Sequence, residues 1–477
     1  MIGVMKRLAR TLFAVLFAAS FPHQVAGQRS PPTLIVLITI DQFRADYIDR
    51  FNRQLHGGLA RISRGGAWFT NAHQDHAITE TAPGHATLLS GRFPRSTGIF
   101  ANRVGVIDES SPLIDAPGAT GASPRRFQGT TLVDWLRAKD PQSRALSVSM
   151  KDRAAILPVG RSRAEVYWYH ADGHFTTSRY YRDTLPDWVK RFNARNLPHT
   201  ITDIDEITLA LALDGLSALS LGTESRTDVL AISLSATDLI GHSYGPDSPE
   251  MSDNILRVDR ILGPFVDSLF KLRDSARVAI VLTADHGVGS MPEVARSVKP
   301  TPVRVDAAEL ASGLRAILAA ANIDANLVEL DQQIVLADRN ALKDRTATLD
   351  SALDLFARQV RALPGVSRVD RIHDLLKGDT INDPITRRWV HQLPARTNAQ
   401  MVITLTPFSI FGGLPATHGS PYDYDTHVPL ILYGSWFVPG KYPEFVRTVD
   451  LAPTLAAIAG VKPGEKIDGV VLRRALR

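Results

Sequence analysis

Aspartate and histidine side chains follow apolar runs at several places in this chain. Asp41 comes directly after "TLIVLITI", and the pair in "TADHG" follows "VAIVLT". A single aspartate after a strand is usually a helix N-cap, and a single His-Gly is usually a turn, so the prediction depends on the whole set. Together these residues offer enough nitrogen and oxygen ligands for two divalent metal ions: Asp41, Asp238, His242, Asp285, His286 and His418.

Two metal ions about 4 Å apart suit in-line displacement at phosphorus, where one activates the nucleophile and the other holds the leaving oxygen. The stretch "DHAITETAPGHATLLSG" offers Thr81 as that nucleophile. Pro83 and Gly84 indicate a helix start, where free N–H groups attract phosphate. Metal coordination would lower the pKa of the hydroxyl, which is otherwise a poor nucleophile. The alternative is that Thr81 only caps the helix, and His85 is expected to pack nearby.

Positively charged side chains must also contact the phosphoryl oxygens of the substrate. In "SMKDRAAIL", Lys151 and Arg153 are two residues apart, so in an extended chain they point to the same side. Arginine binds two oxygens as a fork, and lysine adds a mobile point charge. In "FANRVG", the Asn102 amide offers a further donor. Each of these residues alone would be an ordinary solvated loop residue.

The elements that must position these residues follow an α/β pattern. The runs "TLIVLITI", "ALSVSM", "DVLAISLS", "VAIVLTA" and "VPLILYG" are apolar and rich in β-branched residues, as in buried strands, and helical patterns separate them. This alternation predicts a doubly wound, mostly parallel central sheet with helices on both faces. Ligands bind beyond the carboxyl ends of such strands. We expect insertions at about 158–202 and, as a small α+β cap, at about 304–412.

The N-terminal residues and the composition indicate where the protein acts and which classes of partner it can bind. Residues 1–27 have a basic start, an apolar middle and a small-residue end, which predicts a signal peptide and a periplasmic or secreted protein. An uncleaved anchor is the alternative, and no later apolar run is long enough to span a membrane. Cleavage would lower the net charge from +5 to +2, because it removes Lys6, Arg7 and Arg10. A net charge this close to zero does not indicate nucleic-acid binding. There is no cysteine, so any metal site uses His, Asp, Glu or a hydroxyl.

The motifs as a set resemble the alkaline phosphatase superfamily, and most closely the bacterial exported alkaline phosphatases that use a threonine nucleophile. The strings that carry the resemblance spread over nearly all of residues 28–477: "LITIDQFRADY", "TETAPGHATLLSG", "GIFANR", "SMKDRAAILP", "SATDLIGHSYGPDS", "TADHGV" and "THGSPYDYDTHVPLILYG".

This resemblance implies a role for each candidate residue. One zinc ion would bind to Asp238, His242 and His418. The other would bind to Asp41, Asp285, His286 and the Thr81 oxygen. Thr81 would be phosphorylated and then released by water, while the phosphoryl oxygens would be held by Asn102, Lys151 and Arg153. Manganese or cobalt could replace zinc. His427 in "YDTHVP" is an alternative to His418, which we prefer because the relatives carry this ligand in a His-Gly turn.

The resemblance also separates the competing functions. Phosphodiesterase and nucleotide pyrophosphatase relatives share the Thr and Asn but lack the Lys-Arg pair, so the pair favours small phosphate monoesters over diesters. A sulfatase needs a convertible Cys or Ser in a C/S-x-P-x-R pattern, which reads Thr-Ala-Pro-Gly-His here. A serine hydrolase is suggested by "GHSYG" around Ser243, although several residues separate this serine from the strand. A non-catalytic metal- or phosphate-binding module is the remaining alternative.

Overall fold

The computed structural model describes residues 30–116, 118–195, 200–394 and 397–477. The expected signal peptide at residues 1–27 lies outside these residues. Residues 31–477 form one compact unit. No helix among the described residues is both long enough and apolar enough to cross a membrane.

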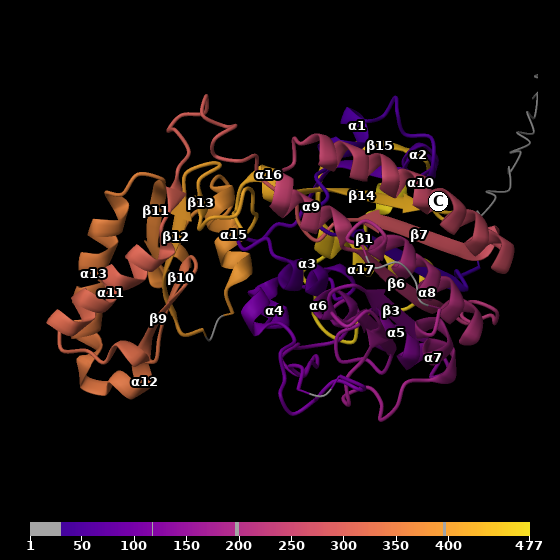
Figure 1. Cartoon of the computed structure of the whole chain (residues 1–477), viewed down its shortest axis with the longest axis horizontal. Helices are drawn as coiled ribbons and strands as arrows, with labels where there is room; N and C mark the ends of the chain where they lie inside the picture. Colours follow the sequence, from indigo (N-terminus) through magenta and orange to yellow (C-terminus); the bar gives the residue numbers. More distant parts are fainter. Residues whose placement is uncertain (1–29, 117, 196–199, 395–396) are drawn as a thin grey trace, which may run out of the picture. The chain divides into compact units, whose positions relative to one another are not determined.

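The described residues form a nine-stranded mixed sheet at the centre of the fold (Figure 1). Its central pairs β3–β6, β6–β1 and β1–β7 are all parallel, while β14 is antiparallel to both β7 and β2. In spatial order the strands are β15 (Gly440–Arg447), β2 (Ala67–His73), β14 (His427–Tyr433), β7 (Val278–Thr283), β1 (Leu34–Ile40), β6 (Asp228–Leu234), β3 (Ala145–Ser149), β4 (Glu165–Tyr169) and β5 (Phe175–Thr176).

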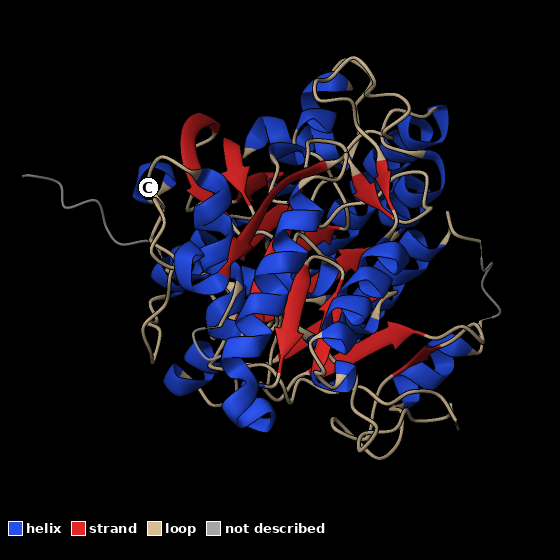
Figure 2. Cartoon of the chain, turned by 90° about the vertical axis from the view of Figure 1, so that its left-hand side faces the viewer, coloured by secondary structure: helices blue, strands red, loops and turns tan. Residues whose placement is uncertain are grey.

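Helices cover both faces of this sheet, so the α/β, doubly wound fold predicted from the sequence is confirmed (Figure 2). The core on one face includes residues of α2 (Gly58–Gly65), α7 (Asp187–Asn193), α8 (Ile204–Ala218), α9 (Ala236–Tyr244) and α10 (Pro249–Leu272). The core on the other face includes residues of α3 (Thr81–Leu88), α5 (Leu132–Lys139), α6 (Asp152–Ile156) and α17 (Leu451–Ala459). Shorter helices are α1 (Asp46–Arg50), α4 (Pro94–Thr97) and α16 (Asp423–Thr426).

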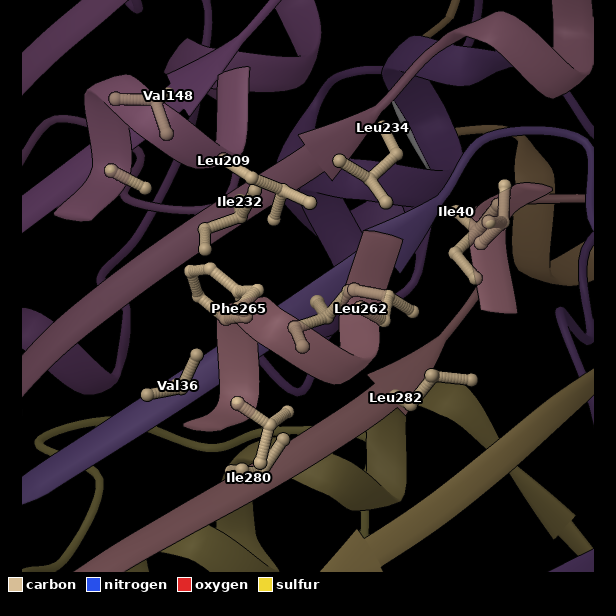
Figure 3. Packing of buried hydrophobic residues seen from close by; sticks show 14 of the residues in the cluster. Val36, Ile40, Val148, Leu209, Ile232, Leu234, Leu262, Phe265, Ile280 and Leu282 are labelled. Carbon is tan, nitrogen blue, oxygen red and sulfur yellow. The ribbon is translucent and has the colours of Figure 1, made fainter. Parts of the chain in front are cut away.

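Side-chain alternation along the central strands explains why both faces are covered. In β1, Val36 and Ile40 belong to one core, whereas Ile35 and Leu37 belong to the other. Figure 3 shows Leu262 and Phe265 of α10 packed over strand residues of the first core. Since successive side chains of a strand point to opposite faces, a run that is apolar at every position must be buried on both sides.

A second, smaller body of structure lies within residues 304–412. It contains a four-stranded sheet in the order β11-β12-β10-β9, with antiparallel pairing throughout, and its own apolar core. Helices α11 and α13 lie against this sheet (Figure 1). The elements are β8 (Arg304–Val305), α11 (Ala307–Ala320), β9 (Val328–Asp331), β10 (Ile334–Ala337), α12 (Arg339–Leu342), α13 (Thr346–Arg361), β11 (Val366–Arg371), α14 (Ile372–Leu375), α15 (Pro384–Gln392), β12 (Ala399–Leu405) and β13 (Ile410–Phe411).

The other segment expected as an insertion, residues 158–202, continues the central sheet. Its strand β4 pairs in parallel with β3, and β5 pairs with β4 at the edge of the sheet. The aromatic residues of β4 explain this position, because Tyr167 and Trp168 are buried on opposite faces of the sheet, one in each core. The segment therefore extends the main architecture.

Candidate metal-dependent active site

The carboxyl ends of adjacent parallel strands bring the candidate metal ligands together. Asp41 directly follows β1, Asp285 lies two residues beyond β7, and Asp238 lies in the first turn of α9 beyond β6. The three carboxylates are almost completely buried, with at most 4% of each residue exposed. Burying several like charges is costly unless cations compensate them, so this edge of the sheet has the character of a cation site.

One group of ligand atoms comes from Asp238, His242 and His418. The Asp238 and His242 side chains meet across one turn of α9, with 3.3 Å between Oδ1 and Nε2, as the D-x-x-x-H spacing predicted. His418 Nε2 lies 3.5 Å from the same oxygen. The Nδ1 atoms of the two rings contact the carbonyl oxygens of Ala416 and Thr79, at 3.0 and 2.7 Å. These outer contacts orient both Nε2 atoms toward Asp238, which is typical of metal-binding histidines.

A second group centres on His286. Its Nε2 atom lies 3.4 Å from Asp41 Oδ1 and 3.5 Å from Asp285 Oδ2, and its Nδ1 atom contacts the Gly287 carbonyl oxygen at 3.0 Å. His286 Nε2 and these two carboxylate oxygens are buried and have no hydrogen-bond partner among the described residues. Tetrahedral ligands at 2.0–2.1 Å from zinc lie about 3.3–3.4 Å from one another. His286 Nε2 therefore lies at the spacing of a shared zinc ion from each of the two carboxylate oxygens, and Asp285 Oδ2 also lies 3.1 Å from His85 Nδ1.

Asp238 lies between the two groups. Its carboxylate also lies near Asp41 and His286, so that one oxygen from each aspartate and one ring nitrogen of His286 could contact a common ion. A carboxylate with two oxygens can serve neighbouring cations on its two sides. Asp238 is thus a candidate ligand in both groups.

The electrostatics differ between the candidate ligands: the lowered pKa of His286 favours its ligand form, whereas the raised pKa values of Asp41 and His418 oppose theirs. Burial raises the pKa of Asp41 to about 6, with a further contribution from Asp285 and opposition from Lys151. Burial and the adjacent His418 ring lower the pKa of His286, so this imidazole is neutral at pH 7. Although burial opposes it, the contact with Asp238 raises the pKa of His418 to about 9. Metal binding to His418 must therefore displace a proton below that pH.

Lys151 supplies positive charge at the same place. Its Nζ atom lies 2.5 Å from both Asp41 Oδ2 and Asp238 Oδ2. The sequence prediction placed this ammonium against phosphoryl oxygens, whereas here it bridges two carboxylates that are candidate metal ligands. An ammonium and a metal ion compete for the same oxygens, because both are compensated by the same negative charge.

Thr81 is the first residue of α3, and Glu80 before it is the N-cap residue, with extended backbone angles. Thr81 therefore lies one residue beyond the capping position that the alternative interpretation assigned to it. The Thr81 side chain, on a residue that is 1% exposed, lies in the first turn of α3, at the positive end of the helix dipole. This position still favours an anion next to the hydroxyl.

Two neighbours tie the start of α3 to the other site residues. His85 Nδ1 contacts the Thr81 carbonyl oxygen at 2.9 Å and lies 3.1 Å from Asp285 Oδ2. The Asn102 carboxamide oxygen accepts a hydrogen bond from Ala82 N at 2.8 Å, which leaves its NH₂ group as a donor. His85 thus packs behind Thr81, as expected, and Asn102 stands beside the same helix start.

Close packing against Asp285 also explains the glycine after Pro83. A Cβ atom on Gly84 would lie 2.2 Å from the Asp285 carbonyl oxygen, far inside contact distance. Any larger residue would push α3 away from β7. The Pro-Gly pair therefore starts the helix and allows its close approach to a candidate metal ligand, as the sequence indicated.

A cavity of about 380 Å³ opens onto this edge of the sheet. It is lined by Asn102, His242 and His418, together with residues of the 304–412 segment, of which Gln332 and Phe408 are examples. A substrate that reaches the metal groups would thus touch both parts of the fold.

Arg153 lies outside the lining of this cavity. It sits in the first turn of α6, with NH1 3.6 Å from Asp152 Oδ1, and its Nε atom is buried without a hydrogen-bond partner among the described residues. The extended chain assumed for Lys151 to Arg153 is wrong, because the helix begins at Asp152. The acidic residue at the helix start and the following alanines favour helix there.

The structure separates the remaining histidine and serine candidates from the metal groups. His427 Nε2 contacts the Thr70 carbonyl oxygen at 2.8 Å, and its ring stacks on His73. Ser243 is an exposed residue within α9 whose hydroxyl donates to the Leu239 carbonyl oxygen at 2.8 Å. A nucleophile elbow needs a serine at a sharp strand-to-helix turn, so the "GHSYG" match does not form one.

Gln42 is a site residue that sequence reasoning missed. Its side-chain amide donates to Asp238 Oδ1 at 2.7 Å, and its backbone N–H donates to Asp285 Oδ1 at 3.2 Å. The backbone is in the left-handed region, with φ of 63°. Gln42 thus orients one carboxylate of each metal group. Only its position after Asp41 could have signalled this role.

Comparisons with known proteins identify the family. A model of the family described as type I phosphodiesterase / nucleotide pyrophosphatase matches residues 35–375. The chain belongs to this family. It is 30% identical to alkaline phosphatase PhoK of Sphingomonas sp. over 92% of this chain and 90% of that protein. Alkaline phosphatase PhoV of Synechococcus elongatus is 28% identical, over 96% of this chain and 94% of its own.

A solved structure supports the same assignment of the fold. The wild-type alkaline phosphatase PafA aligns with a TM-score of 0.84 and 24% identity, over 94% of this chain and 99% of that chain. The expected resemblance to the alkaline phosphatase superfamily is thereby confirmed, and this family member is an enzyme that hydrolyses phosphate esters.

Replacing Gln42 with alanine should weaken metal binding by about 10- to 100-fold, the usual effect of removing a residue that orients a metal ligand. The change frees Asp238 Oδ1 from its amide donor while leaving all candidate ligands in place. Zinc affinity is measured by competition with a chromogenic chelator. Gln54→Ala, at an exposed position, is the matched control. Equal affinity in both variants would exclude this role.

Proposed function

We propose that this enzyme is an alkaline phosphatase that hydrolyses phosphate monoesters through a phosphothreonine intermediate at a site for two zinc ions. The observation that carries the proposal is the buried pair of His286 Nε2 and Asp41 Oδ1, which have no hydrogen-bond partner among the described residues, close to a helix start that presents Thr81. Similarity to alkaline phosphatases over nearly the whole chain supports it.

Each metal group has its own ligands in this proposal. One zinc ion is held by Asp238, His242 and His418. The other is held by Asp41, Asp285, His286 and the Thr81 oxygen. When bound, the two ions supply Lewis-acid activation of the nucleophile and of the leaving oxygen.

The residues of the chain perform the remaining work. The Thr81 oxygen forms a bond to phosphorus as the ester P–O bond breaks, the threonine proton is lost to solvent, and the alcohol leaves with a proton from water. Water then attacks the phosphothreonine, which releases phosphate and restores the hydroxyl. The Asn102 NH₂ group and the Thr81 backbone N–H, at the start of α3, donate to the phosphoryl oxygens.

Lys151 and Arg153 define the substrate class in this proposal. We infer that the Lys151 ammonium turns from Asp41 and Asp238 to the phosphoryl group when those carboxylates hold metal, and that Arg153 supplies a second cation. Two cations suit a monoester with two negative charges better than a diester with one. Phosphodiesterase activity, which the family description includes, is the alternative.

Lys151→Ala and Arg153→Ala should each lower kcat/KM for an aryl phosphate monoester by about 10- to 150-fold, since a charge-assisted contact contributes about 1.5–3 kcal/mol. The loss for a matching aryl phosphate diester should be smaller. Steady-state kinetics on both substrates measures this. Equal losses on the two substrates, or a wild-type protein that prefers the diester, would favour the diesterase.

We also propose that the protein is exported, and we assign the boundaries of its catalytic domain. The layout of residues 1–27 supports a signal peptide, residues 28–477 would form the catalytic domain with additions at about 158–202 and 304–412, and the mature enzyme would act in the periplasm or outside the cell. Its partners would be small phosphate monoesters.

A further inference from the structure

A second cavity, of about 800 Å³, lies at the opposite end of the central sheet from the metal groups. It is formed where β3 and β4 begin, whereas Lys151 follows the end of β3. The five residues of β3 span roughly 16 Å at about 3.3 Å per residue. The two cavities share no lining residue. The second cavity is therefore a separate site.

Four arginines line this cavity, from three different parts of the chain. Arg137 lies on α5, Arg144 directly precedes β3, and Arg161 and Arg163 precede β4. Among the described residues, no carboxylate lies within 4 Å of the guanidinium nitrogens of any of the four. The acid in the lining, Glu165, is engaged by Arg182, with 2.6 Å between Oε2 and NH1. The cavity thus carries a concentrated positive charge.

Two of the four guanidinium groups are fixed in place by backbone carbonyls. Arg137 Nε donates to the Ser143 carbonyl oxygen at 2.9 Å, and Arg144 NH1 donates to the Leu219 carbonyl oxygen at 2.6 Å. A guanidinium has five N–H donors in a rigid fork, so each keeps most of its donors free. Fixed forks lose little entropy when they bind an anion.

The arginines also destabilise one another. Burial lowers the pKa of Arg137, and the positive charge of Arg163 lowers it further, although Asp134 and Asp228 attract it from a distance. Surface arginines usually point into solvent or toward carboxylates. Like charges that gather around a hollow are compensated when an anion enters it.

We propose that this cavity binds a small organic molecule that carries at least two phosphate or sulfate groups. Four guanidinium groups can pair with two anionic groups at the same time, whereas one inorganic phosphate would leave some of them without an anion. The volume lies within the range of about 300–1,000 Å³ that is usual for small-molecule sites. The separation from the metal groups makes this binding independent of the hydrolytic reaction.

The test uses 1,3-benzenedisulfonate, which has two fixed anionic groups and no ester to hydrolyse. Isothermal titration calorimetry of the zinc-loaded full-length protein should show binding with a Kd below about 1 mM. Benzenesulfonate, with one anionic group, should bind at least about tenfold more weakly. Added salt should weaken both, because the attraction is between charges.

Substitutions in the cavity test whether the disulfonate binds there. The double variant Arg161→Gln/Arg163→Gln should bind the disulfonate at least about tenfold more weakly than the wild type, since two charge-assisted contacts are lost. Its hydrolysis of an aryl phosphate and its unfolding temperature should be unchanged, which excludes misfolding. The double variant Arg315→Gln/Arg358→Gln, at exposed positions on α11 and α13, is the control with the same charge change and should bind normally. Absence of binding by the wild type, or equal binding by the double variant, would overturn the proposal.

Discussion

Thr81→Ala should reduce the hydrolysis of an aryl phosphate monoester by at least about 10⁴-fold, the scale of loss seen when a covalent nucleophile is removed. The hydroxyl has no substitute, because alanine offers no oxygen to phosphorus. The fold should survive, since alanine is a good helix residue and the substitution removes little volume. Steady-state kinetics and thermal unfolding of the variant measure both parts.

Two further variants make this result specific. Thr81→Ser keeps a hydroxyl on the first turn of α3 and should retain substantial activity. Ser243→Ala removes the hydroxyl of the "GHSYG" stretch and should leave activity unchanged, because that residue is exposed on α9. Loss of activity in Ser243→Ala together with normal metal binding would instead favour a serine hydrolase.

Removing the metal ions should abolish hydrolysis, and adding zinc should restore it. The proposed mechanism depends on the ions for the activation of Thr81, so dialysis against a chelator should leave less than about one part in 10³ of the activity. The unfolding temperature should also fall, because ions that bind only the folded chain stabilise it. Activity assays and calorimetry before and after dialysis follow both effects.

The extent of the destabilisation depends on Lys151. In the metal-free protein its ammonium compensates Asp41 and Asp238, so the fold should persist. The same dialysis of Lys151→Ala should lower stability more, since breaking a buried ion pair costs about 3–5 kcal/mol. Full activity after chelation would refute the metal-dependent mechanism.

Much of the architecture was predictable from local pattern. The runs that became β1, β3, β6 and β7 are buried at every position, because both faces of these strands are covered, and the apolar residues that this requires give a strong signal. The D-x-x-x-H spacing of Asp238 and His242 is likewise a local property of one helix. The position of the ligands after strands then predicted that they would meet at one edge.

Other features depend on contacts that no local pattern records. Strand β2, "AWFTNAH", has polar residues because it lies near the edge of the sheet, so it was not recognised. The antiparallel direction of β14 follows from the chain path through residues 304–412. Gln42 acts through a rare positive φ and through residues about 200 positions away. The Lys151 contacts likewise join distant parts of the chain.

The central claim, a phosphorylated Thr81, is tested most directly by trapping the intermediate. Enzyme mixed with an aryl phosphate is quenched in acid within one turnover, digested with trypsin and analysed by tandem mass spectrometry. We predict one added phosphoryl group in the peptide of residues 65–92, with fragments that place it on Thr81. A phosphoryl group on any other residue of a protein that turns over normally would contradict the account.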